Sequence, residues 1–237
     1  MGVVYMINFS SLNVSQMLIP NNVQYQKTVY KGVPALQVSE VPAYNAAFAK
    51  ADVNKINQGN AYLEVTTIPF FEGLIDVDVA AVRNNFSYQF PITATQNLLV
   101  GAMAGLTFRQ QSVNQYDAFY LRAGAGRLNN PAPTAPLSHL GAQYISPPTW
   151  IFSNLQKSKP LYTSGADVAE GEWTHICLAI CNNTLTAWVG SNPNPVFNQV
   201  PLLGTGLPGP IGLFVDSGTV TYFANLRVSP TMPLNLF

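Results

Sequence analysis

The chain has 237 residues, of which 48% are hydrophobic and only 9% are charged. Its 11 basic and 11 acidic residues cancel and form no basic run, which excludes the electrostatic footprint of a nucleic-acid-binding protein. So large an apolar fraction excludes a disordered chain, and no apolar run approaches the roughly 18 residues that span a membrane.

Alternation of apolar and polar residues predicts strands through most of the chain. Residues 44–57 are the one stretch that favours a short helix. After it, the alternation predicts strands at Leu74–Val79, Gly105–Arg109 and Tyr116–Arg122. The following stretch, residues 124–160, is rich in Pro, Asn and Ser and predicts long loops around one strand near Gln143–Ile145.

Two hairpins are predicted toward the end of the chain. The first joins residues 173–181 to 184–189 through Asn182 and Asn183, which tolerate the positive φ angles of a tight primed turn. The second joins residues 211–215 to 219–228 around 216–218. The register of the first hairpin brings apolar residues opposite one another, with Ile176, Leu178 and Ile180 facing Val189, Ala187 and Leu185.

The two cysteines are not expected to form a disulfide. Cys177 and Cys181, the two cysteines, share one predicted strand, about 13 Å apart at ~3.3 Å per residue, whereas a disulfide needs Cα atoms within about 7 Å. We therefore expect free thiols.

The same sequence features predict the fold class. Many short strands and 18 prolines favour a sandwich over a helix bundle. Because no repeat or linker divides the chain, the sequence predicts one all-β domain over residues 1–237, a two-sheet antiparallel jelly-roll sandwich.

Several segments, taken as an ordered set, resemble the concanavalin A-like lectin/glucanase superfamily in its laminin G-like bacterial branch. They run from about residue 35 to residue 228 and comprise Phe71–Val79, Gly105–Arg109, Tyr116–Arg122, Gln143–Tyr144 with Trp150, Gly171–Thr174, Gly209–Val215 and Tyr222–Val228.

The resemblance implies two antiparallel sheets, one of them curved, with a concave face that holds carbohydrate in many relatives. It does not imply catalysis. Glucanases of this superfamily carry a nucleophile and an acid on one strand in a Glu-x-Asp-x-x-Glu or similar pattern, and that pattern does not occur in this sequence.

A set of polar and aromatic side chains forms the candidate ligand site. If the strands neighbour one another as the resemblance implies, these side chains gather on one sheet face. Planar hydrogen-bonding groups suit sugar hydroxyls, and aromatic rings pack against sugar C–H groups. The alternative for the charged residues is that the two arginines and the two aspartates form internal ion pairs. The alternative for Trp150 is that its side chain fills the end of the sandwich. The candidates are Asp76, Asp78, Arg109, Tyr116, Tyr120, Arg122, Trp150, His175 and Trp188.

Other chemistry has less support in the sequence. Asp76 and Asp78 would lie about 6.6 Å apart on one strand face, within the range of glycosidase carboxylate pairs, but alternating aspartates are ordinary on a half-exposed strand. No nucleophile elbow accompanies His139 or His175. No metal-binding spacing occurs, so no catalytic or metal-binding residue is assigned. A calcium site in the loops is left open, with Asp167 and Asp216 as candidates, although a turn fits both residues better.

Composition also bears on location. Because charged residues are scarce, against roughly 25% in ordinary domains, Asn, Gln, Ser and Thr must cover the surface, which favours an extracellular or cell-surface protein. Residues 1–20 lack the basic start and unbroken apolar core of a signal peptide. A removed leader or another export route is therefore expected, and a cytoplasmic protein remains the alternative.

The sequence thus predicts a non-catalytic, lectin-like carbohydrate-binding domain. One alternative is a structural or adhesive sandwich that binds copies of itself or other proteins, because its low charge and many amide side chains fit assembly as well. A further alternative is a glycan-active hydrolase with Asp76 and Asp78 as its acid and base.

Overall fold

The computed structural model describes residues 4–9, 17–41, 62–83, 99–112, 115–127, 140–145, 162–164, 168–204, 206–215 and 219–230. Several sequence predictions lie outside these residues, namely the helix at 44–57, His139, Trp150, Asp167 and Asp216.

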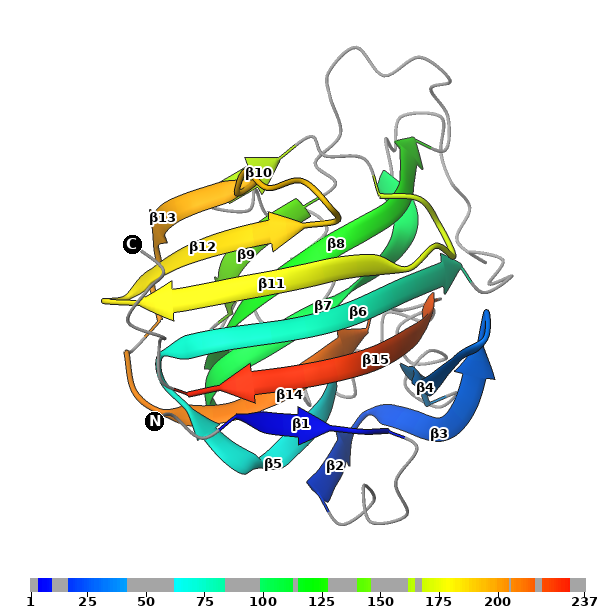
Figure 1. Cartoon of the computed structure of the whole chain (residues 1–237), viewed down its shortest axis with the longest axis horizontal. Coiled ribbons are helices and arrows are strands. Elements are labelled where there is room, and N and C mark those ends of the chain that lie inside the picture. The colour runs from blue at the N-terminus through cyan, green and yellow to red at the C-terminus, as the bar shows by residue number, and fades with distance from the viewer. Residues whose placement is uncertain are drawn as a thin grey trace, which may run out of the picture.

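Two antiparallel sheets pack face to face as a jelly-roll sandwich (Figure 1). Sheet A has eight strands in the order β13-β12-β11-β6-β15-β4-β3, with β1 also paired to β15. The bounds of its strands are β1 Tyr5–Ile7, β3 Val23–Tyr30, β4 Val33–Glu40, β6 Gly73–Arg83, β11 Thr174–Cys181, β12 Thr184–Val189, β13 Phe197–Pro201 and β15 Thr219–Ser229.

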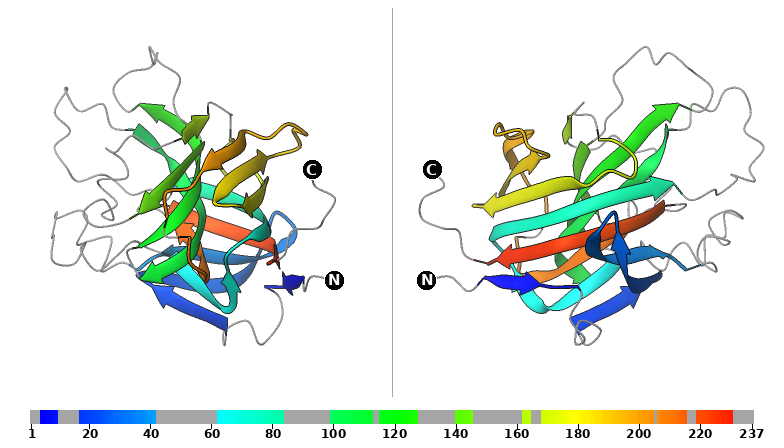
Figure 2. Two further views of the ribbon diagram at one scale, coloured as in Figure 1. Left: turned by 90° about the vertical axis from the view of Figure 1, so that its left-hand side faces the viewer. Right: turned by 45° about the vertical axis from the view of Figure 1, so that its right-hand side comes forward.

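Sheet B has seven strands in the order β10-β9-β8-β7-β14-β5-β2. Seen edge on, its strands β7, β8 and β9 form a layer beside sheet A (Figure 2, left). The bounds of its strands are β2 Leu18–Asn21, β5 Tyr62–Phe70, β7 Leu99–Ser112, β8 Gln115–Arg127, β9 Leu140–Ile145, β10 Tyr162–Ser164 and β14 Gly209–Val215.

The core lies between the sheets and follows the alternation of the sequence. On β6, Ile75, Val77 and Val79 are at most 1% exposed, whereas Asp76 and Asp78 between them point to the outer face of sheet A. Because successive side chains of a strand point to opposite faces, the same rule divides every long strand into a core side and an outer side. The all-β sandwich and its strands at β6, β7, β8 and β9 are therefore confirmed.

The first predicted hairpin is confirmed in its register. Ile176 pairs with Val189, Leu178 with Ala187 and Ile180 with Leu185, as predicted. Asn182 and Asn183 have φ angles of 48° and 58°, the left-handed values that a primed turn requires. Cys177 and Cys181 are free thiols.

The second predicted hairpin is wrong. β14 pairs with β5 and β7 in sheet B, whereas β15 pairs with β4, β6 and β1 in sheet A. β14 and β15 therefore lie in different sheets. In both strands alternate apolar residues, such as Leu213 and Phe223, point toward the same core. The alternation in the sequence is therefore the same for two strands in opposite sheets as for the two strands of a hairpin.

Strand β15 shares one of its edges between two partners. Val220–Phe223 pair with β4, and Leu226–Val228 pair with β1. Between the two partners the strand bulges at Asn225, which has a φ of 54°.

Across the described ranges, no helix has the length and apolar character needed to cross a membrane.

Candidate functional site

The predicted site residues are divided between the two sheets. Asp76, Asp78, His175 and Trp188 lie on strands of sheet A, and the other described candidates lie on β7 and β8 of sheet B. The prediction that they gather on one sheet face is therefore wrong. Alternation along a strand shows which side is polar, but it does not show to which sheet the strand belongs.

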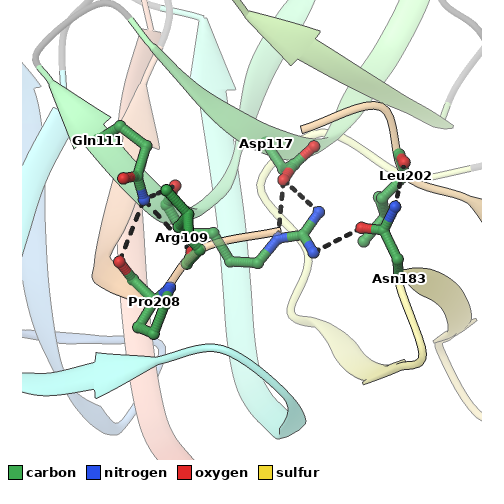
Figure 3. A network of polar contacts seen from close by, with 7 residues as sticks. Arg109, Gln111, Asp117, Asn183, Leu202 and Pro208 are labelled. Atoms are coloured by element: carbon green, nitrogen blue, oxygen red, sulfur yellow. Dashed lines mark hydrogen bonds and ion pairs between the residues drawn. The ribbon is translucent and has the colours of Figure 1, made fainter. Parts of the chain in front are cut away.

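Arg109 does not lie on an outer face. A bulge gives it a φ of 51° and turns its side chain inward, where the residue is 2% exposed. Its Nε donates to Oδ2 of Asp117 over 2.9 Å, and its Nη1 donates to Oδ1 of Asn183 over 2.7 Å (Figure 3). Asn183 in turn donates to the carbonyl of Leu202 over 2.9 Å. The network ties β7 and β8 of sheet B to the β11–β12 turn of sheet A.

Asp117, the partner of Arg109, was missed by the sequence reasoning. It stands on the core side of β8, in step with Phe119 and Leu121. Desolvation by burial raises the pKa of its carboxyl, against the opposing effects of Arg109 and the Gly204 backbone. The sequence did contain a signal for Asp117, because it is an ionisable residue at a position of the strand where the alternation predicts a buried side chain. Such a group needs a buried partner. The predicted internal ion pair exists, but with Asp117 and not with Asp76 or Asp78.

The outer face of sheet A carries a connected polar cluster, which we call the aspartate face: Asp76, Asp78, His175, Cys177, Trp188 and Asn225. Asp78 accepts a hydrogen bond from Asn225 over 2.7 Å and lies 2.8 Å from Nδ1 of His175. Nε2 of His175 lies 3.6 Å from Asp76. The side chains of both aspartates are over a quarter exposed, at 28% and 27%, so this face is open to solvent.

Cys177 lies on the aspartate face in surroundings that disfavour ionisation of its thiol. Burial, assisted by Asp76, raises its pKa to about 12, and only a thiolate attacks as a nucleophile. Among the residues with described positions, no group of three His, Cys, Asp or Glu side chains is arranged to hold a metal ion.

The outer face of sheet B is aromatic, and we call it the tyrosine face: Tyr62, Met103, Thr107, Tyr116, Ala118, Tyr120, Arg122 and Phe214. None of these residues is more than 7% exposed, although they point away from the core between the sheets. The rings of Tyr62 and Tyr116 meet edge to face with centroids 5.5 Å apart. Gly212 makes room for this packing, because a Cβ there would lie 3.0 Å from the Tyr62 ring.

Arg122 is the cation of the tyrosine face. Its Nε donates to the sulfur of Met103 over 3.3 Å, and its guanidinium carbon lies 5.6 Å from the centroid of the Tyr120 ring. It is 7% exposed. Within the part of the chain that the structure describes, no carboxylate forms an ion pair with it.

Among the described residues of sheet B, two polar atoms besides Oδ1 of Asp117 are buried without a hydrogen-bond partner. One is the hydroxyl of Tyr120, whose pKa burial raises. The other is Oε1 of Gln110, which donates through its amide nitrogen to Thr107. Leaving such an atom unsatisfied costs about 1–3 kcal/mol. The tyrosine face therefore combines aromatic rings, a cation and polar atoms with unused bonding capacity.

Solved structures of known proteins share this fold. A carbohydrate-binding module from Bacillus subtilis, CBM66, is 10% identical with a TM-score of 0.55, over 90% of this chain and 96% of that one. A protein of unknown function with a galectin-like fold, also from Bacillus subtilis, is 11% identical with a TM-score of 0.52, over 95% and 94%. The Crh5 transglycosylase in complex with NAG is 8% identical with a TM-score of 0.51, over 95% and 83%.

These likenesses show the fold alone, a β-sandwich of two antiparallel sheets. No family model matches the sequence, and no curated protein matches it.

Proposed function

We propose that this chain is a non-catalytic carbohydrate-binding domain and that the tyrosine face is its ligand surface. The observation that carries the proposal is the hydroxyl of Tyr120, which is buried without a partner beside Arg122 and several aromatic rings. Sugars present C–H faces that pack on such rings and hydroxyls that bond to such polar groups.

The shared fold supports this proposal without deciding it. One similar structure is named as a carbohydrate-binding module, and another, a transglycosylase, is in complex with NAG. Our proposal includes the laminin G-like branch, a single domain over residues 1–237 and an extracellular or cell-surface location. Arg109 is removed from the proposed anchors, because its guanidinium is bonded to Asp117 and Asn183.

The substitution Tyr120→Phe tests the site. It removes the hydroxyl and keeps the ring, so we expect unchanged or slightly higher stability and about tenfold weaker glycan binding. Binding is measured on a glycan array and then by calorimetry, with the unfolding midpoint recorded for each variant. Tyr222→Phe is the matched control, because Tyr222 lies on the outer face of sheet A, where it stacks on Tyr30. An array that stays blank for the native protein would overturn the proposal.

The aspartate face is tested in the same assay. Asp76, Asp78, His175 and Trp188 were predicted as ligand residues and stay candidates, because their face is open. Trp188→Ala is the direct probe: a loss of binding with Tyr120→Phe unaffected would move the ligand surface to sheet A. Trp150, also predicted, is tested by Trp150→Ala.

One observation favours self-association as a second function. β3 ends sheet A and has eight residues without proline or positive φ. The other terminal strands are shorter, and β13 and β2 contain Pro201 and Pro20. Long regular edges pair with other strands, and a net charge of zero offers no repulsion. Light scattering over a concentration series should then show a dimer that Val29→Lys dissociates. A monomer at every concentration would contradict it.

A further inference from the structure

The charge balance of the tyrosine face points to the class of glycan, on the premise of the proposed function. Arg109 and Arg122 are the two arginines that the structure describes as buried. Arg109 has a carboxylate partner, Asp117, whereas Arg122, among the described residues, donates to the sulfur of Met103 and contacts the ring of Tyr120. Thioether sulfur is a weak acceptor, and a ring face interacts less strongly with a guanidinium than a carboxylate does.

An arginine in this position is costly for the free protein. Burying a charge costs several kcal/mol unless an opposite charge and hydrogen bonds compensate it. The Nε–H donates to Met103, and no carboxylate of the described residues forms an ion pair with the terminal amino groups. A guanidinium fork matches the geometry of a planar carboxylate or of a sulfate.

Glu64 is an acidic residue on the same sheet face. It lies on β5 and pairs directly with Gly212 of β14. Burial raises the pKa of its carboxyl.

We propose that the ligand of the tyrosine face is an acidic glycan whose carboxylate or sulfate binds the guanidinium of Arg122. The unpartnered hydroxyl of Tyr120, beside that guanidinium, donates a hydrogen bond to the same anionic group or to its sugar ring. The rings of Tyr62, Tyr116 and Phe214 supply the apolar surface for the sugar.

Matched ligand pairs test the proposal. Calorimetry compares tetragalacturonic acid with its methyl ester, and a glycan array compares sialylated and sulfated glycans with their neutral counterparts. We expect the acidic member of at least one pair to bind more than about tenfold tighter, with an affinity that falls as salt rises. The pair that responds distinguishes a carboxylate from a sulfate.

Two variants assign the effect to Arg122. Arg122→Gln should abolish the preference for the acidic member, and Arg122→Lys should keep part of it, because the ammonium retains the charge without the fork. Arg122→Gln should also keep or raise the unfolding midpoint, since it removes an uncompensated buried charge. If it fails to fold, the comparison of acid with ester on the native protein still decides.

The outcomes of these experiments distinguish the proposal of an acidic ligand from the proposal that the domain binds carbohydrate. Equal binding of acidic and neutral members overturns the acidic ligand, and a preference that survives Arg122→Gln overturns its binding to Arg122; either outcome leaves carbohydrate binding intact. Absence of binding to every acidic and neutral glycan overturns both.

Discussion

The ion pair between Arg109 and Asp117 is closed to solvent, with side chains that are 1% and 2% exposed. Removing one partner leaves an uncompensated charge, so we expect Arg109→Met and Asp117→Leu each to lower the free energy of unfolding by about 3–5 kcal/mol. The double variant should cost much less than the sum of the two, because no charge is left buried. Urea unfolding of the four proteins measures this coupling; additive losses would contradict it.

The thiol of Cys177 gives a pH-dependent prediction. With a pKa raised to about 12, it is only about 0.01% thiolate at pH 8, against roughly a quarter for a free cysteine. In the Cys181→Ser variant, alkylation by iodoacetamide should therefore be about a thousandfold slower than for glutathione, and should speed up as the pH rises toward 12. Unfolding in urea is the control and should restore the ordinary rate. Alkylation of the folded protein at the rate of glutathione would show that Cys177 is not held protonated.

At the scale of the element, the β11–β12 turn combines two different asparagines. Both have left-handed φ angles, but only Asn183 bonds to Arg109 and to the carbonyl of Leu202. Asn182→Gly should be nearly neutral, Asn182→Ala should cost about 1 kcal/mol through backbone strain, and Asn183→Gly should cost more through its lost bonds. Unfolding midpoints rank the three variants. A neutral Asn183→Gly would mean that the bonds across the sandwich contribute nothing.

The strands also show how much the sequence predicts. Alternation located β6, β7 and β8 and set the register of β11 on β12, because each such pattern is local. Sheet membership is not local: β14 and β15 face one core from opposite sides, and the same alternation serves a hairpin or an arch. The bulges at Arg109 and Asn225 were not predicted for a related reason, since each of these residues lies inside a stretch that otherwise reads as a regular strand.

The candidate site was predicted in composition and missed in arrangement. Tyr116, Tyr120 and Arg122 alternate along β8 and share a face as predicted. Tyr62 and Phe214 lie beside them on strands that are distant in the sequence, and no local sequence pattern predicts this contact. Which residues are buried also depends on the packing of the whole chain.

At the scale of the whole molecule, burial of the tyrosine face has a kinetic consequence for the proposed function. Tyr120 and Arg122 are 2% and 7% exposed, so a ligand must wait until they open to solvent. The observed association rate should therefore level off at high ligand concentration, at the rate of opening. Stopped-flow fluorescence with the glycan identified on the array measures it. A rate that rises linearly without limit would show an already open face.

The place of β15 in sheet A bears on the order in which the protein is made. This strand joins β6 on one side to β4 and β1 on the other, yet Thr219–Ser229 leave the ribosome after every other strand. Until they emerge, the strands made first, β1, β3 and β4, have no partner in the rest of sheet A. Closure of sheet A therefore follows the synthesis of β15, and until then the apolar sides of these strands are exposed, which favours aggregation of the nascent polypeptide.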